Sequence, residues 1–319
     1  MGHHEHMRIP GTDLDVSRLC LGANVFGWTS DKATSFEVLD RYVEAGGQFI
    51  DTADMYSCWM EGNVGGESES IIGEWMASRG NRDSMIIATK VGKLPTRHGL
   101  TPENVRIAAT ESLQRLRTDR IDLYYAHADD PDVPLIDALS GLDALVRSGD
   151  VRAIAASNYD AHRLSEALAI SEREGLARFV ALQQHYNLME RAEFEGPLRD
   201  VCVTNGLVTF PYFALARGFL SGKYRVGAAP TEETSGPRAS DARAYLTERG
   251  VSVLGALEDI AAGHGCSMGA VALAWLAAQP TVAAPIASAR TTTQLDELLP
   301  MLSLHLTAEE LALLDAASE

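Results

Sequence analysis

The sequence has few cysteines, few basic residues and no long apolar run, and each shortage excludes a class of protein. Its four cysteines lie far apart and form no Cys-x-x-Cys pair, so neither a disulfide framework nor a zinc site is expected. Lysine and arginine number 27 against 44 acidic residues, giving a formal net charge of −17. Such an acidic surface argues against nucleic acid or an anionic membrane as a partner. With no bilayer-length apolar run and no signal peptide, a cytoplasmic protein is expected.

The composition does not change along the chain, which favours one domain. Residues 8–319 are expected to form it, because 319 residues suit a single α/β barrel with insertions. Residues 1–7 contain three histidines and resemble the remnant of an affinity tag, so they are left out of the functional argument.

Short apolar segments alternate with helical patterns, which is typical of a parallel sheet. Strands are expected at 18–21, 49–51, 85–90, 121–126, 151–157, 179–183, 207–211 and 282–286. No Gly-x-Gly-x-x-Gly turn follows any of these segments, which disfavours an open dinucleotide-binding sheet. Eight such units favour a (β/α)8 TIM barrel, in which chemistry lies at the carboxyl ends of the strands. The connection 223–243 is too long for an ordinary βα loop and is expected to be a functional or mobile loop.

Polar side chains follow the predicted strands at their carboxyl ends. Asp51 ends the second strand and Tyr56 follows it, Lys90 ends the third, and His127 follows the fourth. Each residue alone could be structural, as an ion pair, a rim histidine or a loop aromatic. Together they suit proton transfer to a carbonyl oxygen, because an ammonium favours phenolate and a histidine can bond the carbonyl.

The segments around these residues resemble the motifs of the aldo-keto reductases over nearly the whole chain after residue 8. Residues 49–56 read FIDTADMY and resemble the DTAxxY motif, and residues 66–73 resemble GxSExxxG. Residues 87–90 and 122–127 resemble the strands that carry the family's lysine and histidine. Within the family, the sequence resembles bacterial members close to the branch of the potassium-channel β-subunits. It implies a barrel with extra helices and an N-terminal β-hairpin.

The resemblance implies an oxidoreductase that reduces an aldehyde or ketone to an alcohol with NADPH. By this resemblance Tyr56 is the proton donor and Lys90 lowers its pKa. Asp51 pairs with Lys90, and His127 orients the carbonyl. A small carbonyl compound is the expected partner, without nucleic acid, membrane or metal, and the oligomeric state is left open.

The resemblance also implies an extended NADPH site at the barrel mouth. Ser157, Asn158 and Gln183 would bond the nicotinamide carboxamide, and Tyr212 would stack on the ring. The phosphate and adenosine contacts implied are Leu215, Arg217, Gly218, Lys223, Ser288, Arg290, Gln294 and Glu297.

The segment after the seventh strand departs from the family pattern. Phe213 and Ala214 stand where the family usually has serine and proline. Backbone amides and Arg217 or Lys223 are therefore expected to carry more of the phosphate binding.

Three aromatic residues could line the substrate pocket. They are Phe26, Trp28 and Trp59, in loops after the first and second strands. The alternative is that these rings pack onto their own loops.

Two other functions fit the same residues. Proteins similar to this family serve potassium channels as regulatory subunits, binding NADPH as a low-turnover redox sensor. A barrel could also use Lys90 and Asp51 for Schiff-base chemistry.

Overall fold

A closed barrel of parallel strands forms the centre of the molecule. The computed structural model describes residues 6–227, 229, 231 and 234–319. Eight parallel strands pair in the order β11-β10-β9-β8-β5-β4-β3-β12. Their bounds are β3 Cys20–Gly22, β4 Phe49–Asp51, β5 Ile86–Val91, β8 Ile121–Ala126, β9 Val151–Ser157, β10 Phe179–Gln183, β11 Val208–Thr209 and β12 Ile286–Ala287. The sheet closes where Thr209 bridges Val282 and the Ile286 N–H donates to the Pro211 carbonyl. The predicted (β/α)8 fold is therefore confirmed.

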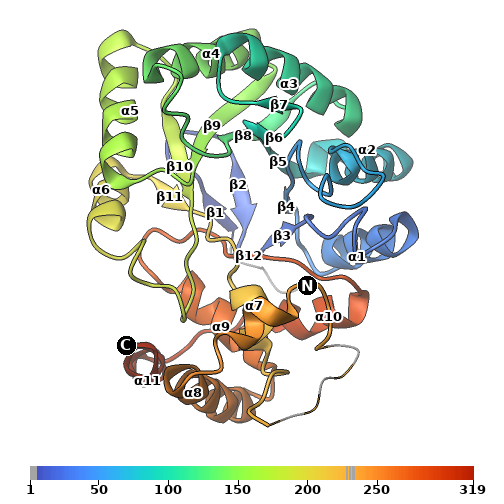
Figure 1. Ribbon diagram of the computed structural model, residues 1–319, viewed down its shortest axis with the longest axis vertical. Coiled ribbons are helices and arrows are strands. Elements are labelled where there is room, and N and C mark those ends of the chain that lie inside the picture. Colours follow the sequence, from blue (N-terminus) through green and yellow to red (C-terminus); the bar gives the residue numbers. More distant parts are fainter. Residues whose placement is uncertain (1–5, 228, 230, 232–233) are drawn as a thin grey trace.

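Helices surround this barrel (Figure 1). Six of them follow successive strands: α1 Lys32–Glu44, α2 Glu67–Arg79, α3 Pro102–Leu116, α4 Leu135–Ser148, α5 Ala161–Glu174 and α6 Pro197–Asn205. The rest come after β11: α7 Ala239–Arg243, α8 Glu248–His264, α9 Met268–Ala277, α10 Thr292–Leu298 and α11 Ala308–Ser318. The 3-10 helices are η1 Arg82–Ser84, η2 Ala216–Ser221 and η3 Leu299–Leu302. Thr101 and Thr307 cap α3 and α11, each accepting a hydrogen bond from a backbone N–H group.

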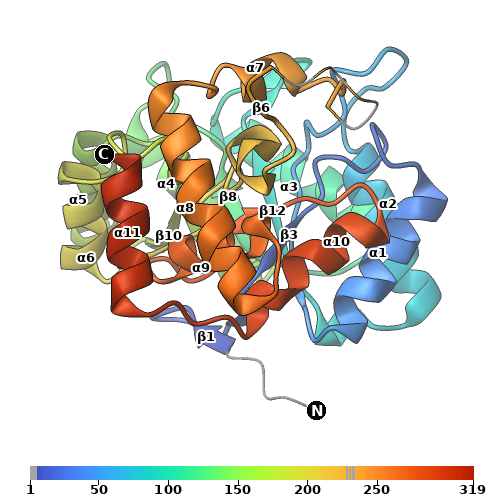
Figure 2. The same ribbon diagram turned by 90° about the horizontal axis from the view of Figure 1, so that it is seen from below.

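The two ends of the barrel differ. At one end the hairpin of β1 (His6–Arg8) and β2 (Asp15–Ser17) closes the barrel, with Val16 buried in the interior cluster. Figure 2 shows β1 at this end and α7 and β6 (Lys93–Leu94) at the other, where the strands end. β1 includes His6 and Met7, which the sequence analysis placed in the tag remnant, while residues 1–5 lie outside the described residues.

Close packing of α2 explains the GxSExxxG motif. A methyl group on Gly73 would lie 2.2 Å from the Arg115 carbonyl oxygen, so α2 and α3 can touch only through a glycine. Ser68 donates to the Ala23 carbonyl, and the buried Glu69 accepts from Arg115 and Thr89. These bonds hold α2 against the ends of β3 and β5, beside the candidate site.

Several elements were not expected from the sequence. They include α6, α10, and a small hairpin in which β6 pairs with β7 (Arg97–His98). In the described part of the chain, no single helix is long and apolar enough to cross a bilayer. The pair α8 and α9 passes that test only when joined, and the two helices meet at 98°.

Candidate active site

A buried lysine organises the carboxyl ends of β4 and β5. The Lys90 side chain is fully buried, and its Nζ donates to Asp51 Oδ2 at 2.6 Å, the Thr52 carbonyl at 2.7 Å and Tyr56 Oη at 2.9 Å. Three acceptors match the three N–H donors of an ammonium group. Burial lowers the pKa of Lys90 while Asp51 raises it, and the three bonds suit an ammonium group in contact with Tyr56.

The environment of Tyr56 favours the protonated phenol. Burial and the neighbouring Asp51 carboxylate raise the pKa of Tyr56 well above its usual value. The sequence analysis expected Lys90 to lower this pKa, but burial is the largest influence on it and Asp51 the next, and both raise it. Lys90 can instead stabilise the phenolate that forms once the proton has left.

His127 stands beside this group as a neutral imidazole. Its ring centroid lies 6.1 Å from that of Tyr56, and the residue is only 9% exposed. Burial, followed by the charges of Lys90 and Lys93, lowers the pKa of His127 well below its usual value. A neutral imidazole keeps one N–H, which can donate to a carbonyl oxygen in the cavity.

Side chains from β9, β10 and the following loops extend the network. Gln183 Nε2 donates to Asp51 Oδ1 at 2.8 Å, so both oxygens of Asp51 are used. Asn158 donates to the His127 carbonyl and to Ser157 Oγ, and it accepts from Tyr212 Oη at 2.8 Å. Asn158 adopts a left-handed backbone conformation with φ 56°, which asparagine tolerates better than most residues.

A cavity of about 480 Å³ opens over these residues. It is lined by every predicted site residue except Lys90, Phe26 and Glu297. Lys90 lies behind Tyr56 and Asp51, Phe26 is fully buried in the hydrophobic core, and Glu297 is exposed on α10. Trp28 and Trp59 do reach the cavity, where their rings meet edge to face at 5.4 Å.

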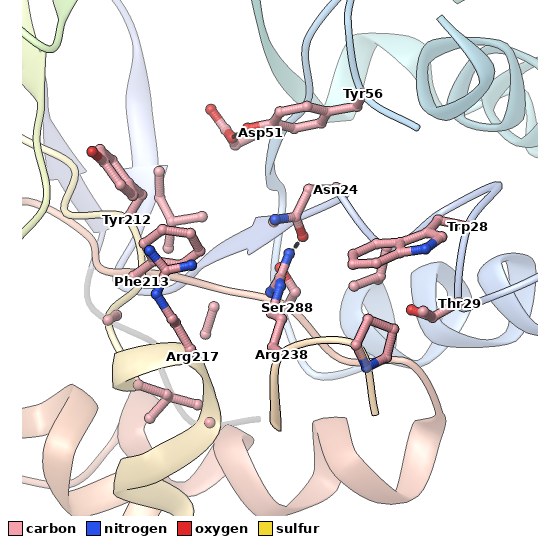
Figure 3. Close-up of a pocket in the computed structure, with 18 of the residues that line it drawn as sticks. Asn24, Trp28, Thr29, Asp51, Tyr56, Tyr212, Phe213, Arg217, Arg238 and Ser288 are labelled. Atoms are coloured by element: carbon pink, nitrogen blue, oxygen red, sulfur yellow. Dashed lines mark hydrogen bonds between the residues drawn. The ribbon is translucent and has the colours of Figure 1, made fainter. Parts of the chain in front are cut away.

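The opposite side of the cavity carries positive charge (Figure 3). Arg217, Lys223, Arg238 and Arg290 all line it, although the whole chain has a net charge of −17. The Phe213 ring has guanidinium groups over it, with Arg217 at 4.2 Å and Arg238 at 5.6 Å. The phenylalanine that departs from the family pattern therefore holds two cations in place.

Arg238 is a candidate functional residue that the sequence analysis missed. Its guanidinium lies between the rings of Trp28 and Phe213 and makes no hydrogen bond or ion pair with any described residue. Burial and the nearby Arg217 lower its pKa. The one signal in the sequence was its place in the long connection 223–243, four residues of which lie outside the described part of the chain.

Backbone strain marks the same region. Phe213, Ala216 and Arg217 have φ values of 51°, 46° and 59°, in the left-handed region that non-glycine residues seldom adopt. Clusters of such residues are frequent where a backbone is shaped to hold a ligand. The described residues contain no group of His, Cys, Asp and Glu placed to hold a metal ion.

Comparisons with known proteins agree with this geometry. Residues 18–319 match the model of the Aldo/keto reductase family. Protein tas of Escherichia coli is 33% identical over 99% of this chain and 98% of its own length. The uncharacterized oxidoreductase YrpG of Bacillus subtilis is 35% identical over 98% and 95%. The aryl-alcohol dehydrogenase [NADP(+)] of Phanerodontia chrysosporium is 32% identical over 99% and 86%.

A second acidic residue beside the site has a buried carboxyl group. Asp54 is 1% exposed, and neither carboxyl oxygen accepts a hydrogen bond from a described residue. Burial and the nearby Glu69 carboxylate raise the pKa of Asp54 to about 7. In the unfolded chain an aspartate titrates near ~3.9. The folded chain therefore holds a proton on Asp54 between these two pKa values.

We predict that Asp54→Asn stabilises the protein at high pH. As the pH rises from about 4 to about 7, Asp54 ionises in the unfolded chain but keeps its proton in the folded chain, so the free energy of unfolding falls. This fall is complete above pH ~7. The gain in unfolding free energy from Asp54→Asn should grow by on the order of 2 kcal/mol between about pH 5 and pH 8. Urea titrations at the two pH values measure it, with the exposed Asp119→Asn as control. A gain that is the same at both pH values would contradict the buried titration.

Proposed function

The chain belongs to the aldo/keto reductase family, and we propose that it reduces an aldehyde or ketone to the alcohol with NADPH. The observation that carries this proposal is the bond of 2.9 Å from the Lys90 ammonium to Tyr56 Oη, at the floor of a cavity lined by His127. An acid, a group that stabilises its conjugate base, and a carbonyl-binding imidazole are the parts that such a reduction needs.

Tyr56 is proposed as the proton donor. Its raised pKa keeps the phenol protonated at neutral pH, so the proton is present when substrate binds. As negative charge grows on the substrate oxygen, Tyr56 gives up its proton, and the Lys90 ammonium stabilises the phenolate left behind. Asp51 keeps that ammonium charged and fixed, because it accepts from Lys90 at 2.6 Å.

His127 is proposed to orient the carbonyl. Because its pKa is low, the His127 ring is neutral at neutral pH. It can therefore donate a hydrogen bond to the substrate oxygen, but it has no imidazolium proton to transfer in place of Tyr56. The Asn158 bond to the His127 carbonyl holds the end of β8 in position. The Schiff-base alternative has no such support, because Lys90 does not line the cavity and all its donors are used.

The residues of the cavity fit a phosphate-bearing cofactor. Arg238 and Arg290 have guanidinium groups without a hydrogen-bonded partner among the described residues, and both line the cavity with Arg217 and Lys223. Guanidinium groups suit phosphate oxygens, which they bond through two N–H groups. Ser157, Asn158, Gln183 and Tyr212 would hold the nicotinamide end near Tyr56. When bound, NADPH would supply the hydride that the carbonyl carbon accepts.

The names of the relatives are consistent with the proposal. One is a dehydrogenase of aryl alcohols that uses NADP(+), and another is named a norsolorinic acid reductase. We also propose a cytoplasmic setting and a small carbonyl compound as the partner.

We predict that Tyr56→Phe lowers kcat for aldehyde reduction by about 10²–10⁴-fold, the range for loss of a general acid. NADPH binding, measured by fluorescence titration, should persist because the ring still fills its place. Tyr124→Phe is the matched control, since the buried Tyr124 hydroxyl has no hydrogen-bond partner among the described residues and does not line the cavity. Equal turnover of Tyr56→Phe and wild type would remove Tyr56 from the reaction. Barely measurable turnover in the wild type itself, with tight NADPH binding, would favour the redox sensor.

We predict that Arg238 and Arg290 contribute differently to cofactor affinity. Arg238→Met should weaken NADPH and NADH alike by about tenfold or more, because both dinucleotides carry the pyrophosphate. Arg290→Met should weaken NADPH much more than NADH, because only NADPH carries the 2′-phosphate. Titration of both cofactors measures this, with Arg225→Met as control on the same connection but outside the cavity lining. Unchanged affinities in both variants would overturn the cofactor placement.

A further inference from the structure

Lys93 is a cation on the cavity wall that the proposed mechanism does not use. It is the first residue of β6, lines the cavity and is half-buried. Its ammonium makes no hydrogen bond or ion pair with any residue that the structure describes. Lys90, in contrast, has Asp51, and Lys32 on the outer surface has Glu74.

The backbone fixes the position of Lys93. β6 and β7 pair antiparallel with Lys93 opposite His98, and the Gly99 N–H donates to the Gly92 carbonyl at the base of the hairpin. Leu94 is buried against Gly65, where an added methyl group would lie 2.6 Å from Leu94 Cδ1. The hairpin is thus held against the loop that follows Tyr56, and its first residue faces the site.

The surroundings of Lys93 leave its charge uncompensated. Burial lowers the pKa of Lys93, and the charge of Lys90 lowers it further. Lys93 in turn helps to lower the pKa of His127. A half-buried cation among other cations gains from a bound anion, because desolvation and repulsion are both relieved.

Aromatic rings form the neighbouring wall of the cavity. Trp59 lies edge to face against Trp28 at 5.4 Å and against Tyr56 at 6.2 Å, and it remains 44% exposed. Met55 also lines this side. Two indole rings in perpendicular planes beside the proposed acid offer both a face and an edge to a planar ring.

We propose that the substrate is an aromatic aldehyde or ketone bearing a carboxylate, which Lys93 binds while the ring packs on Trp28 and Trp59. This assignment rests on the proposed reductase function and names its substrate class. It is separate from the phosphate-binding cations, because Lys93 lies on the hairpin after β5 whereas the arginines follow β11 and β12. The carbonyl would then lie within reach of Tyr56 and His127, and the carboxylate beside Lys93.

The test compares a charged and a neutral substrate of similar shape. With NADPH saturating, kcat/KM is measured for the best of 2-, 3- and 4-carboxybenzaldehyde and for the corresponding methyl formylbenzoate. The wild type should prefer the carboxylate, and Lys93→Met should lower the ratio of the two values by about tenfold or more, mainly through KM. Lys93→Arg should restore most of the ratio. Lys32→Met removes a lysine outside the cavity and should leave the wild-type ratio.

Two outcomes would overturn the proposal, and they differ from failure of the reductase function. In the first, the wild type reduces the ester and the carboxylate with equal kcat/KM, and Lys93→Met leaves this ratio unchanged. The protein is then a reductase without an anion site at Lys93. If no aldehyde is reduced at all, the reductase function fails, and the site is tested by binding alone. Quenching of tryptophan fluorescence by the same carboxybenzaldehyde should then weaken about tenfold in Lys93→Met. Equal quenching in both proteins would overturn the anion site.

Discussion

The candidate site depends on one buried ammonium. A lysine cation inside a barrel destabilises the fold by several kcal/mol unless its charge and its N–H donors are all satisfied. Lys90 meets this condition through Asp51, the Thr52 carbonyl and Tyr56. Because β4 and β5 pair in parallel with Asp51 opposite Ala88, the two strand ends bring these groups together. The same bonds that make the buried charge tolerable also fix the phenol at the cavity floor.

The other polar residues of the site are hydrogen-bonded around the pair of Lys90 and Asp51. Asp51 uses its second oxygen for Gln183, which ties β4 to β10 across the barrel mouth. Asn158 ties β9 to the end of β8 and to Tyr212. A single hydrogen-bonded arrangement therefore spans five of the barrel strands and their loops, and it leaves one face of Tyr56 and His127 open to the cavity. The positive charge on the other side lies on segments after β11 and β12, away from the buried lysine.

The barrel and the catalytic candidates could be predicted because they depend on local pattern. Apolar strands followed at once by Asp51, Lys90 and His127 place those residues at one end of any parallel barrel. Arg238 and Lys93 could not be found in this way, because their function depends on having no partner, which is a property of the folded surroundings. Burial and Asp51 raise the pKa of Tyr56, and the sequence alone cannot weigh burial against a neighbouring cation. The sequence placed Phe26 in a loop that could line the substrate pocket, but tight turns at residues 23–30 bury it in the core.

The most direct test of this account is the position of the protons on Lys90 and Tyr56. Neutron diffraction from crystals exchanged into D₂O at neutral pH would show them. The account predicts three deuterons on Lys90 Nζ, one of them directed at Tyr56 Oη, and a deuteron retained on the Tyr56 hydroxyl. A neutral Lys90 that accepts the deuteron of Tyr56 would contradict it, because the phenol would then have no cation to stabilise its conjugate base.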